Sequence, residues 1–340
     1  MKRVLSSTST AAPARRFNWR SEWMLAAVTL VLAALLPTVV SGYPIYVLPE
    51  YMIYGMLAMS LGMLWGFTGI LSFGQAAFFT LGAYAMGLAM KWGIGPNPGY
   101  VALLASILIG GVLAALVGYF LFSAGVRDIY FVLVTLALSI MVEQITISQS
   151  QVTGGFNGMF VQRMELTFGP FGKISLTHDV AVYYAVLPVV AFVYWLLRRI
   201  VASSFGKVLI GIRENEDRAI SLGFSTSFYK TAAFAISGAV ACFAGALYGS
   251  HAQFVSPSLA SVQFSTEIVI WVAIGGRQSL LAALLGGIAV ASLSNYLNTI
   301  TPLYWQLVLG LVFIAAIVGF KGGVAGVVQR LAAKRSEEDI

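Results

Sequence analysis

The sequence has little charge, one cysteine and two histidines. Charged residues make up 10% of its 340 residues and hydrophobic residues 59%, whereas an ordinary soluble domain has roughly 25% and 45–50%. This shortage of charge argues against a soluble enzyme, a nucleic-acid-binding protein and a disordered scaffold, and it indicates an integral membrane protein. Cys242 has no second cysteine for a disulfide, and His178 and His251 lie far apart in the sequence, so we expect no metal site.

Common catalytic motifs are also missing. The sequence contains neither Gly-x-Ser-x-Gly nor His-Glu-x-x-His, and a nucleotide-binding loop would end in Gly-Lys-Ser or Gly-Lys-Thr. The Gly-Lys pairs that begin at Gly172 and Gly206 are followed by Ile174 and Val208. We therefore expect no cofactor and no enzymatic activity, and any ATP that drives this protein must be hydrolysed by another chain.

Long apolar runs dominate what is present. The first covers residues 23–40, close to the roughly 20 residues that cross a bilayer core. Nine more cover residues 51–69, 71–90, 101–122, 129–147, 181–197, 231–250, 258–274, 280–297 and 304–320. The sequence predicts an all-α integral membrane protein, a polytopic helical bundle of about ten membrane segments. Residues 22–320 form this single domain, between an N-terminal stub (1–21) and a C-terminal tail (321–340).

Basic residues orient the predicted segments. With ten crossings and the N-terminus inside, 17 of the 20 Lys and Arg residues fall on the inner side, and only Lys91, Arg163 and Lys173 fall outside. Such a bias is typical of cytoplasmic loops. We therefore expect both termini and the loop 198–230 to be cytoplasmic and the loop 148–180 to be periplasmic.

Glycines and polar residues interrupt two of the predicted hairpins. The interruption within residues 51–90 contains Gly66, Thr68, Gly69, Ser72, Gly74 and Gln75, and the one within residues 258–297 covers 275–279. In lipid, such broken helices persist only when they pack inside protein or line a cavity. The pattern predicts two broken or re-entrant hairpins. Their small residues serve either close helix packing or a substrate path lined by Thr68, Ser72 and Gln75.

Two carboxylates lie inside apolar runs. They are Glu143 and Glu267, and Glu50 lies at the start of another run. An ionisable group inside the membrane is costly and points to function. On one hypothesis Glu143 or Glu267 accepts hydrogen bonds from the amine or amide of a passing solute. The alternative is a buried carboxylate bonded to a neighbouring helix, or an end-of-span group that faces water.

The densest charge cluster lies in residues 205–223 of the inner loop. Five apolar residues recur between the charges at near-helical spacing, and Gly223 suits a helix stop. We expect one short amphipathic helix, whose mixed charges favour a protein partner over a lipid anchor. The candidate contact residues are Arg213, Glu214, Glu216, Asp217, Arg218 and Gly223.

Several separated segments resemble a known family. They are residues 66–79 with 82–84, residues 213–223 with 229–230 and 233–234, residues 237–248, residues 256–257 and residues 267–276. In this order they resemble the permeases of branched-chain amino acid ABC importers (Liv type), over roughly residues 45–325. The resemblance implies a subunit of a bacterial inner-membrane importer that works by alternating access.

The same resemblance implies partners. They are a second permease, two cytoplasmic ATPase subunits and a periplasmic substrate-binding protein, with residues 205–223 as the coupling segment. Membrane lipid surrounds the chain, and no nucleic acid is expected.

The sequence does not decide which solute is transported. Residues 267–277 and Tyr304-Trp305 look more like the urea and short-amide branch of the family, whereas residues 213–216 are closer to the amino acid branch. Residues 319–323 depart from the Pro-Lys-Gly or Pro-Arg-Gly of the family. An alternative function is a proton- or ion-coupled secondary transporter, in which Glu143 and Glu267 would carry protons.

Overall fold

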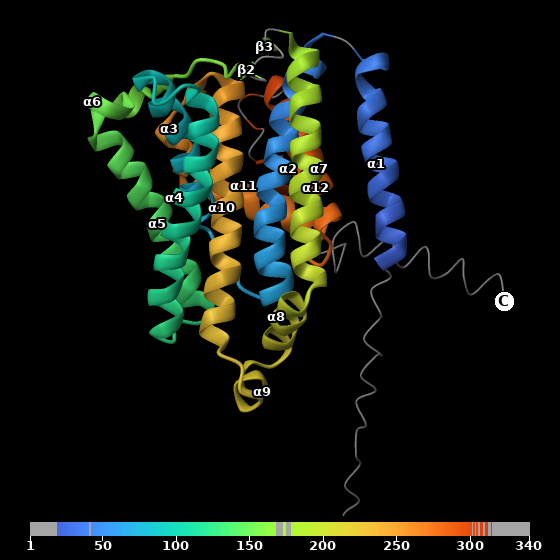
Figure 1. Cartoon of the computed structure of the whole chain (residues 1–340), viewed down its shortest axis with the longest axis vertical. Helices are drawn as coiled ribbons and strands as arrows, with labels where there is room; N and C mark the ends of the chain where they lie inside the picture. The colour runs from blue at the N-terminus through green and yellow to red at the C-terminus, as the bar shows by residue number, and fades with distance from the viewer. Residues whose placement is uncertain are drawn as a thin grey trace, which may run out of the picture.

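The computed structural model of the protein describes residues 19–40, 42–167, 173–174 and 178–300, with isolated positions between 302 and 314. Helices make up most of it (Figure 1). The longer ones are α1 (Trp19–Val39), α2 (Tyr43–Thr68), α3 (Gln75–Trp92), α4 (Pro98–Ser123), α5 (Asp128–Ser148), α7 (Asp179–Ala202), α10 (Thr226–Ala252), α11 (Val262–Gly275) and α12 (Leu280–Ile300). Two short helices, α8 (Ser204–Glu214) and α9 (Glu216–Ser221), follow α7.

The remaining elements are small. Two single turns, α6 (Ser150–Thr153) and the 3-10 turn η1 (Gly155–Asn157), follow α5, and a second 3-10 turn, η3 (Pro257–Ala260), precedes α11. Strand β1 (Met159–Phe160) pairs antiparallel with β4 (Phe254–Val255), and β2 (Leu166–Thr167) pairs antiparallel with β3 (Lys173–Ile174). The strands lie in the connections between helices, so the bundle itself is all-helical.

Each of the first nine predicted apolar runs corresponds to a helix. Six of these helices, namely α2, α4, α5, α7, α10 and α12, are long and apolar enough to cross a membrane. The apolar part of α1, Met24–Val39, and α11 are shorter, and α3 is not among the six. The tenth run, 304–320, lies outside the described residues except for isolated positions. The all-helical membrane fold is therefore confirmed, while the count of ten segments stays a prediction.

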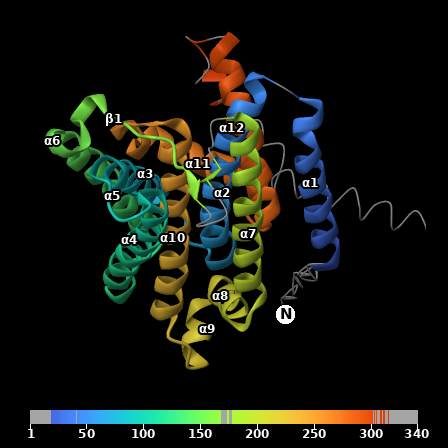
Figure 2. The same cartoon turned by 45° about the horizontal axis from the view of Figure 1, so that its top comes forward.

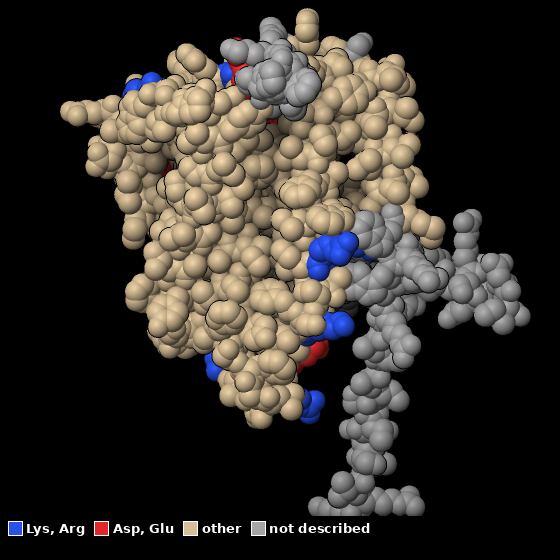
Figure 3. Space-filling view, viewed as in Figure 1, with Lys and Arg blue, Asp and Glu red and all other residues tan. Residues whose placement is uncertain are grey.

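The helix connections place the basic residues at one end of the bundle. The connections after α2, α4, α7 and α11 all lie at the end where α8 and α9 project (Figures 1 and 2). Lys91, in the last turn of α3, and Arg163 and Lys173, in the connection between α5 and α7, lie at the opposite end. In Figure 3 most of the blue side chains gather toward the α8–α9 end, and a broad band almost without charge lies beyond them. This arrangement matches the grouping on which the predicted orientation depends.

Helix α10 packs against α2, α3 and α4 through small residues. A Cβ atom on Gly82 would lie 1.7 Å from the carbonyl oxygen of Cys242, and one on Gly245 would lie 1.8 Å from that of Phe79. On α4, a Cβ on Gly110 would lie 2.4 Å from the Cβ of Cys242. Any side chain would force these backbones apart, so close helix packing is a structural role of these glycines.

Hydroxyl groups satisfy the non-helical backbone between α2 and α3. The amide of Phe73 donates to Oγ1 of Thr135 (3.2 Å), and the carbonyl of Phe73 accepts from Oγ of Ser139 (2.9 Å). The amide of Gly74 donates to Oγ of Ser72 (3.1 Å). Since unpaired backbone groups are costly in an apolar environment, these bonds allow the chain to leave the helical path here. Ser72 and Gly74 are buried here, whereas Thr68, Gly69, Ile70 and Leu71 line a cavity at the α8–α9 end.

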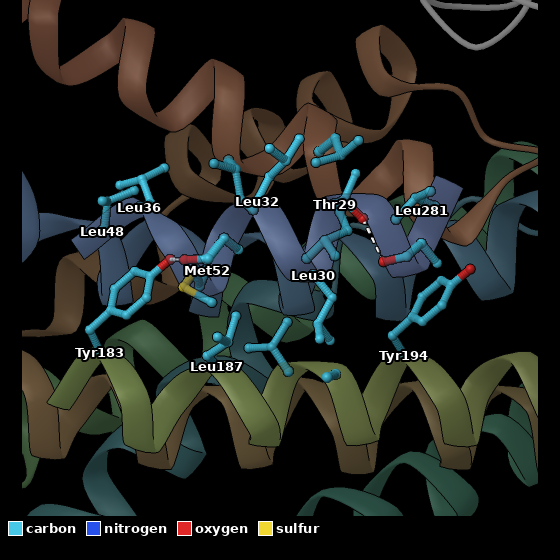
Figure 4. A pocket seen from close by; sticks show the side chains of 17 residues that line it. Thr29, Leu30, Leu32, Leu36, Leu48, Met52, Tyr183, Leu187, Tyr194 and Leu281 are labelled. Atoms are coloured by element: carbon cyan, nitrogen blue, oxygen red, sulfur yellow. Dashed lines mark hydrogen bonds between the residues drawn. The ribbon is translucent and has the colours of Figure 1, made fainter. Parts of the chain in front are cut away.

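Helix α1 lies at the edge of the bundle and borders an apolar groove. The groove holds about 300 Å³ between α1 and helices α2, α7 and α12, and leucines such as Leu30, Leu32 and Leu187 line it (Figure 4). Because Pro37 has no N–H, the carbonyl of Ala33 lacks its usual helical donor. The hydroxyl of Tyr183 on α7 donates to that carbonyl at 2.6 Å (Figure 4). This bond ties the proline-containing turn of α1 to the bundle.

Candidate functional site

A cavity of about 460 Å³ lies between α2, α11 and α12, at the end of the bundle opposite α8 and α9. We call it the carboxylate cavity, because both Glu50 and Glu267 line it. Its lining residues are Glu50, Tyr51, Tyr54, Ser258, Leu259, Ser261, Gln263, Phe264, Glu267, Trp271, Ala291, Ser294, Asn295 and Asn298. Three helices and the η3 turn therefore bring together two acidic residues that are 217 positions apart in the sequence.

Both carboxylates are held by neighbours on their own helices. Oε1 of Glu50 accepts a hydrogen bond from the hydroxyl of Tyr54 (2.8 Å), and Oε1 of Glu267 accepts one from Nε2 of Gln263 (3.2 Å). Each partner lies four residues away, one helical turn along the same face. The periodicity of the helix thus fixes both acidic groups at the cavity.

Aromatic rings form one wall of the carboxylate cavity. The ring centroids of Tyr54 and Trp271 are 5.1 Å apart, and those of Phe264 and Trp271 are 5.8 Å apart. Trp271 is 2% exposed, and its Nε1 is buried without a hydrogen-bond partner among the described residues. The cavity therefore combines acceptors, an apolar wall and a buried donor.

The other candidate path residues lie elsewhere. Nε2 of Gln75 donates to Oγ of Ser237 (2.8 Å), and Oε1 of Gln75 lies 3.3 Å from Oγ of Ser60, all in the buried contact of α2, α3 and α10. Thr68 lines a different cavity, at the α8–α9 end, and Ser72 is fully buried. Glu143 lies on α5. The structure thus brings Glu267 together with Glu50, but not with Thr68, Ser72, Gln75 or Glu143.

Some lining residues were not singled out as candidates from the sequence. Glu50 could have been found from the sequence, since it is a carboxylate at the start of an apolar run. Nothing in the sequence distinguishes Tyr54, Trp271 and Asn295, because aromatic and amide residues also serve as interfacial or helix-packing residues in membrane proteins. Among the described residues, no three His, Cys, Asp or Glu side chains come together as a metal site requires.

At the opposite end, residues 205–223 form two helices rather than the single one that the sequence predicted. Asn215 separates them, because its backbone is extended (ψ 102°) and its side chain accepts a hydrogen bond from the amide of Arg218 (2.8 Å). This bond is an N-cap that starts α9. The stop at Gly223 is confirmed, since this residue has a positive φ of 88° and its amide donates to the carbonyl of Ile220.

Glu216 faces the bundle rather than the solvent. Its Oε1 accepts a hydrogen bond from Nζ of Lys230 (2.6 Å), and its Oε2 lies 3.8 Å from Nε of Arg127. Burial alone would raise the pKa of Glu216, but Lys230, Thr226 and Arg127 together hold this pKa below its ordinary value. This cluster, which we call the Glu216 clamp, ties α9 to the starts of α5 and α10.

Arg213 ties α8 to the end of α2. Its Nη1 donates to the carbonyl oxygen of Gly66, while its Nη2 pairs with Oε1 of Glu214 at 2.6 Å. A Cβ atom on Gly66 would lie 1.7 Å from the carbonyl oxygen of Arg277, in the α11–α12 turn. The end of α2 therefore contacts both α8 and the second interrupted hairpin.

The outer face of α8 and α9 presents exposed apolar residues beside charges. Asp217 and Arg218 are exposed, and Leu222 is 71% exposed. A groove of about 260 Å³ lies between the two helices, lined by Lys207, Val208, Gly211, Asn215, Arg218, Ala219, Leu222 and Phe224. We call this the α8–α9 face.

Comparison with known proteins places this geometry in context. A family model described as "Branched-chain amino acid transport system / permease component" matches residues 43–317. The chain is 28% identical over 284 residues to the "High-affinity branched-chain amino acid transport system permease protein LivM" of Escherichia coli (strain K12). That match covers 76% of this chain and 64% of the LivM protein, so it spans somewhat less than two thirds of the relative's length.

Two further relatives are more distant in identity. A "Probable branched-chain amino acid transport permease protein LivM" of Methanocaldococcus jannaschii is 26% identical over 256 residues, covering 66% of this chain and 72% of that protein. The "D-allose transport system permease protein AlsC" of Escherichia coli is 26% identical over 233 residues, covering 66% and 67%. No solved structure matches the chain.

Proposed function

Since the chain belongs to the family of branched-chain amino acid transport permease components, we propose that it is a permease subunit of an ABC importer. It moves branched-chain amino acids, or urea and short amides, across the bacterial inner membrane by alternating access. A second permease, two cytoplasmic ATPase subunits and a periplasmic binding protein complete the importer. The observation that carries the proposal is the family match over residues 43–317, which includes both interrupted hairpins and the α8–α9 segment.

The α8–α9 face is the proposed ATPase contact. It lies at the end where the basic residues gather, and the positive-inside rule supports a cytoplasmic location for that end. Leu222 is exposed there beside Asp217 and Arg218, and a hydrophobic centre with a charged rim is typical of protein–protein contacts.

The internal bonds of this segment favour a transmitting role. The Glu216 clamp holds α9 against α5 and α10, and Arg213 bonds the last turn of α2. A rigid connection of this kind passes a displacement of α8 and α9 on to the α2 end and, through Gly66, to the α11–α12 turn. A solvated loop without such bonds could not do so.

The substrate path is proposed to include the carboxylate cavity, with Glu267 as one of its residues. The cavity lies toward the end with few basic residues, and the positive-inside rule supports a periplasmic location for that end. We keep Thr68, Ser72, Gln75 and Glu143 as candidates only for stages of transport in which the helices are rearranged, since they lie apart from this cavity. The count of ten membrane segments and two re-entrant hairpins belongs to the same proposal.

Co-purification tests the proposed contact. The tagged chain is expressed with its partner subunits, and the ATPase retained on the permease is quantified for Leu222→Asp. We expect retention and ATP hydrolysis of the purified complex to fall strongly, because a carboxylate replaces an apolar contact. Phe160→Asp is the matched control, since Phe160 is 87% exposed at the opposite end. Equal retention in both variants would place the contact elsewhere, at the Arg277 turn or the C-terminal tail.

A further inference from the structure

The proposed permease function leaves open which part of a solute the carboxylate cavity recognises. We infer that the cavity binds the amine or amide end of a small neutral or cationic solute through Glu50 and Glu267, and that it excludes anions. The solute's apolar part lies against Tyr54, Phe264 and Trp271. This inference deepens the proposed function and rests on it for the claim that the bound molecule is transported.

The charge of the lining supports recognition of N–H groups. Glu50 and Glu267 contribute two carboxylates, and no Lys, Arg or His from the described part of the chain lines the cavity. An ionised carboxylate only accepts hydrogen bonds. In the same part of the chain, each of these carboxylates has one oxygen bonded to a protein donor, Tyr54 for Glu50 and Gln263 for Glu267. The second oxygen of each remains available to an ammonium or amide group.

Two buried donors lie in residues that line the cavity. Nε1 of Trp271 and Oγ of Ser294 are buried and have no hydrogen-bond partner among the described residues, and both residues line the cavity. A buried donor without a partner is unfavourable, but both atoms expose almost no surface to the cavity, so a solute oxygen would reach them only after a side-chain shift. A zwitterionic amino acid and a primary amide each offer both N–H groups and an oxygen, whereas a simple carboxylic acid offers only oxygens and a negative charge.

Size and wall chemistry agree with a small, partly apolar molecule. The volume of about 460 Å³ falls in the range of roughly 300–1,000 Å³ that small-molecule sites occupy. The rings of Tyr54, Phe264 and Trp271 lie within 5.1–5.8 Å of one another and provide a continuous apolar surface. A branched aliphatic side chain or a short alkyl amide would cover this surface.

Cysteine labelling of the full-length chain measures the first property, the local charge. Asn298→Cys, in a Cys242→Ala background, places a thiol at an exposed position of the lining. The chain is reconstituted in vesicles of phosphatidylcholine and phosphatidylglycerol, so that no lipid headgroup carries a primary amine. Rates of modification by a cationic and an anionic methanethiosulfonate reagent are compared.

We expect the cationic reagent to react faster at Asn298→Cys by about tenfold or more, the lower end of the enrichment that a charge-lined cleft produces. The control thiol, Phe160→Cys, lies outside the cavity and sets the baseline ratio of the two reagents. Adding Glu50→Gln and Glu267→Gln should bring the ratio at Asn298→Cys to that baseline. A ratio at baseline before these changes would overturn the inference. Ser258→Cys, at another exposed position of the lining, repeats the measurement if Asn298→Cys fails to fold.

Protection from labelling measures the second property, the ligand class. Leucine, 3-methylbutylamine and 3-methylbutanamide should slow modification of Asn298→Cys at least about twofold, and 3-methylbutanoate at the same concentration should not. Equal protection by the acid, or protection by none of the four compounds, would refute the assignment. Adding phosphatidylethanolamine to the vesicles identifies competition by a lipid amine, which would assign the site to lipid rather than to a transported solute and so overturn the inference. None of these measurements uses the ATPase, so their failure is distinguishable from failure of the proposed function.

Discussion

The Glu216 clamp gives the sharpest prediction about the α8–α9 end. Lys230 is only 8% exposed, and its ammonium nitrogen lies 2.6 Å from Oε1 of Glu216. Glu216→Ala would leave this ammonium group nearly buried with no carboxylate beside it. We expect the free energy of unfolding of the isolated chain to fall, because the loss of a fully buried partner costs about 3–5 kcal/mol.

Solvent reduces that magnitude. The side chain of Glu216 is 21% exposed, so water can enter once the carboxylate is removed, and we expect a loss of about 2–3 kcal/mol, in the range of a charged hydrogen bond. The measurement is reversible unfolding of the purified chain in mixed micelles. Glu214→Ala is the matched control, since the side chain of Glu214 is 68% exposed and its pair with Arg213 should contribute at most about 1 kcal/mol.

The same variants separate two roles for the α8–α9 segment. Glu216→Ala should destabilise the chain even when no ATPase is present, because its partners belong to the bundle. Leu222→Asp should leave the unfolding free energy nearly unchanged and lose only the ATPase. If Glu216→Ala unfolds like wild type while it releases the ATPase, Glu216 contacts the partner directly and the clamp as described is wrong.

Three further predictions concern pH, packing and α1. The pKa of Glu216 is lower in the folded chain than its ordinary 4.5. The clamp's stabilisation should therefore be complete above about pH 4.5 and vanish as the pH falls through the folded pKa. A difference in unfolding free energy between wild type and Glu216→Gln that persisted far below that pH would contradict this. Gly66→Ala should lower the free energy of unfolding by about 1–3 kcal/mol, because its Cβ would overlap the Arg277 carbonyl. Gly211→Ala is the control, since its Cβ would meet no atom within 4 Å, and it should be neutral or slightly stabilising. Equal unfolding free energies for the two variants would show that the α2 end shifts freely. Tyr183→Phe should lower the free energy of unfolding by roughly 0.6–1.7 kcal/mol. A double-mutant cycle with Pro37→Ala should show coupling between the two positions, since alanine restores the backbone donor for the Ala33 carbonyl.

The sequence predicts the helical architecture well for a simple physical reason. Each long apolar run must become a helix, because the bilayer leaves no other way to pair the backbone of a single segment. Residues 101–122 and 129–147 therefore match α4 and α5 to within a few residues. The grouping of basic residues at one end follows equally directly, since alternate connections of an antiparallel bundle share an end.

Local capping explains why the inner loop was predicted less well. The apolar spacing of residues 205–223 fits one helix, but the Asn215 side chain caps a second helix at Arg218. Asparagine also occurs inside helices, so spacing alone does not reveal this break.

Contacts between residues far apart in the sequence explain why the remaining features of the site were not predicted. The sequence favoured packing over a path for Gln75, and its bond to Ser237, 162 residues away, shows that its side chain is held in the core. Glu50 and Glu267 line one cavity because α2 and α11 pack side by side. The sequence around either carboxylate does not indicate that these two helices pack together.

Transport by the reconstituted importer tests the central claim most directly. The chain, its partner permease and the ATPases are placed in proteoliposomes, and leucine and urea uptake are followed with the binding protein on the side of the carboxylate cavity. The account predicts uptake of at least one solute that requires ATP on the α8–α9 side, is stopped by orthovanadate and is unaffected when the proton gradient is collapsed. Uptake by this chain alone, driven by a proton or ion gradient without ATP, would contradict the account and identify a secondary transporter.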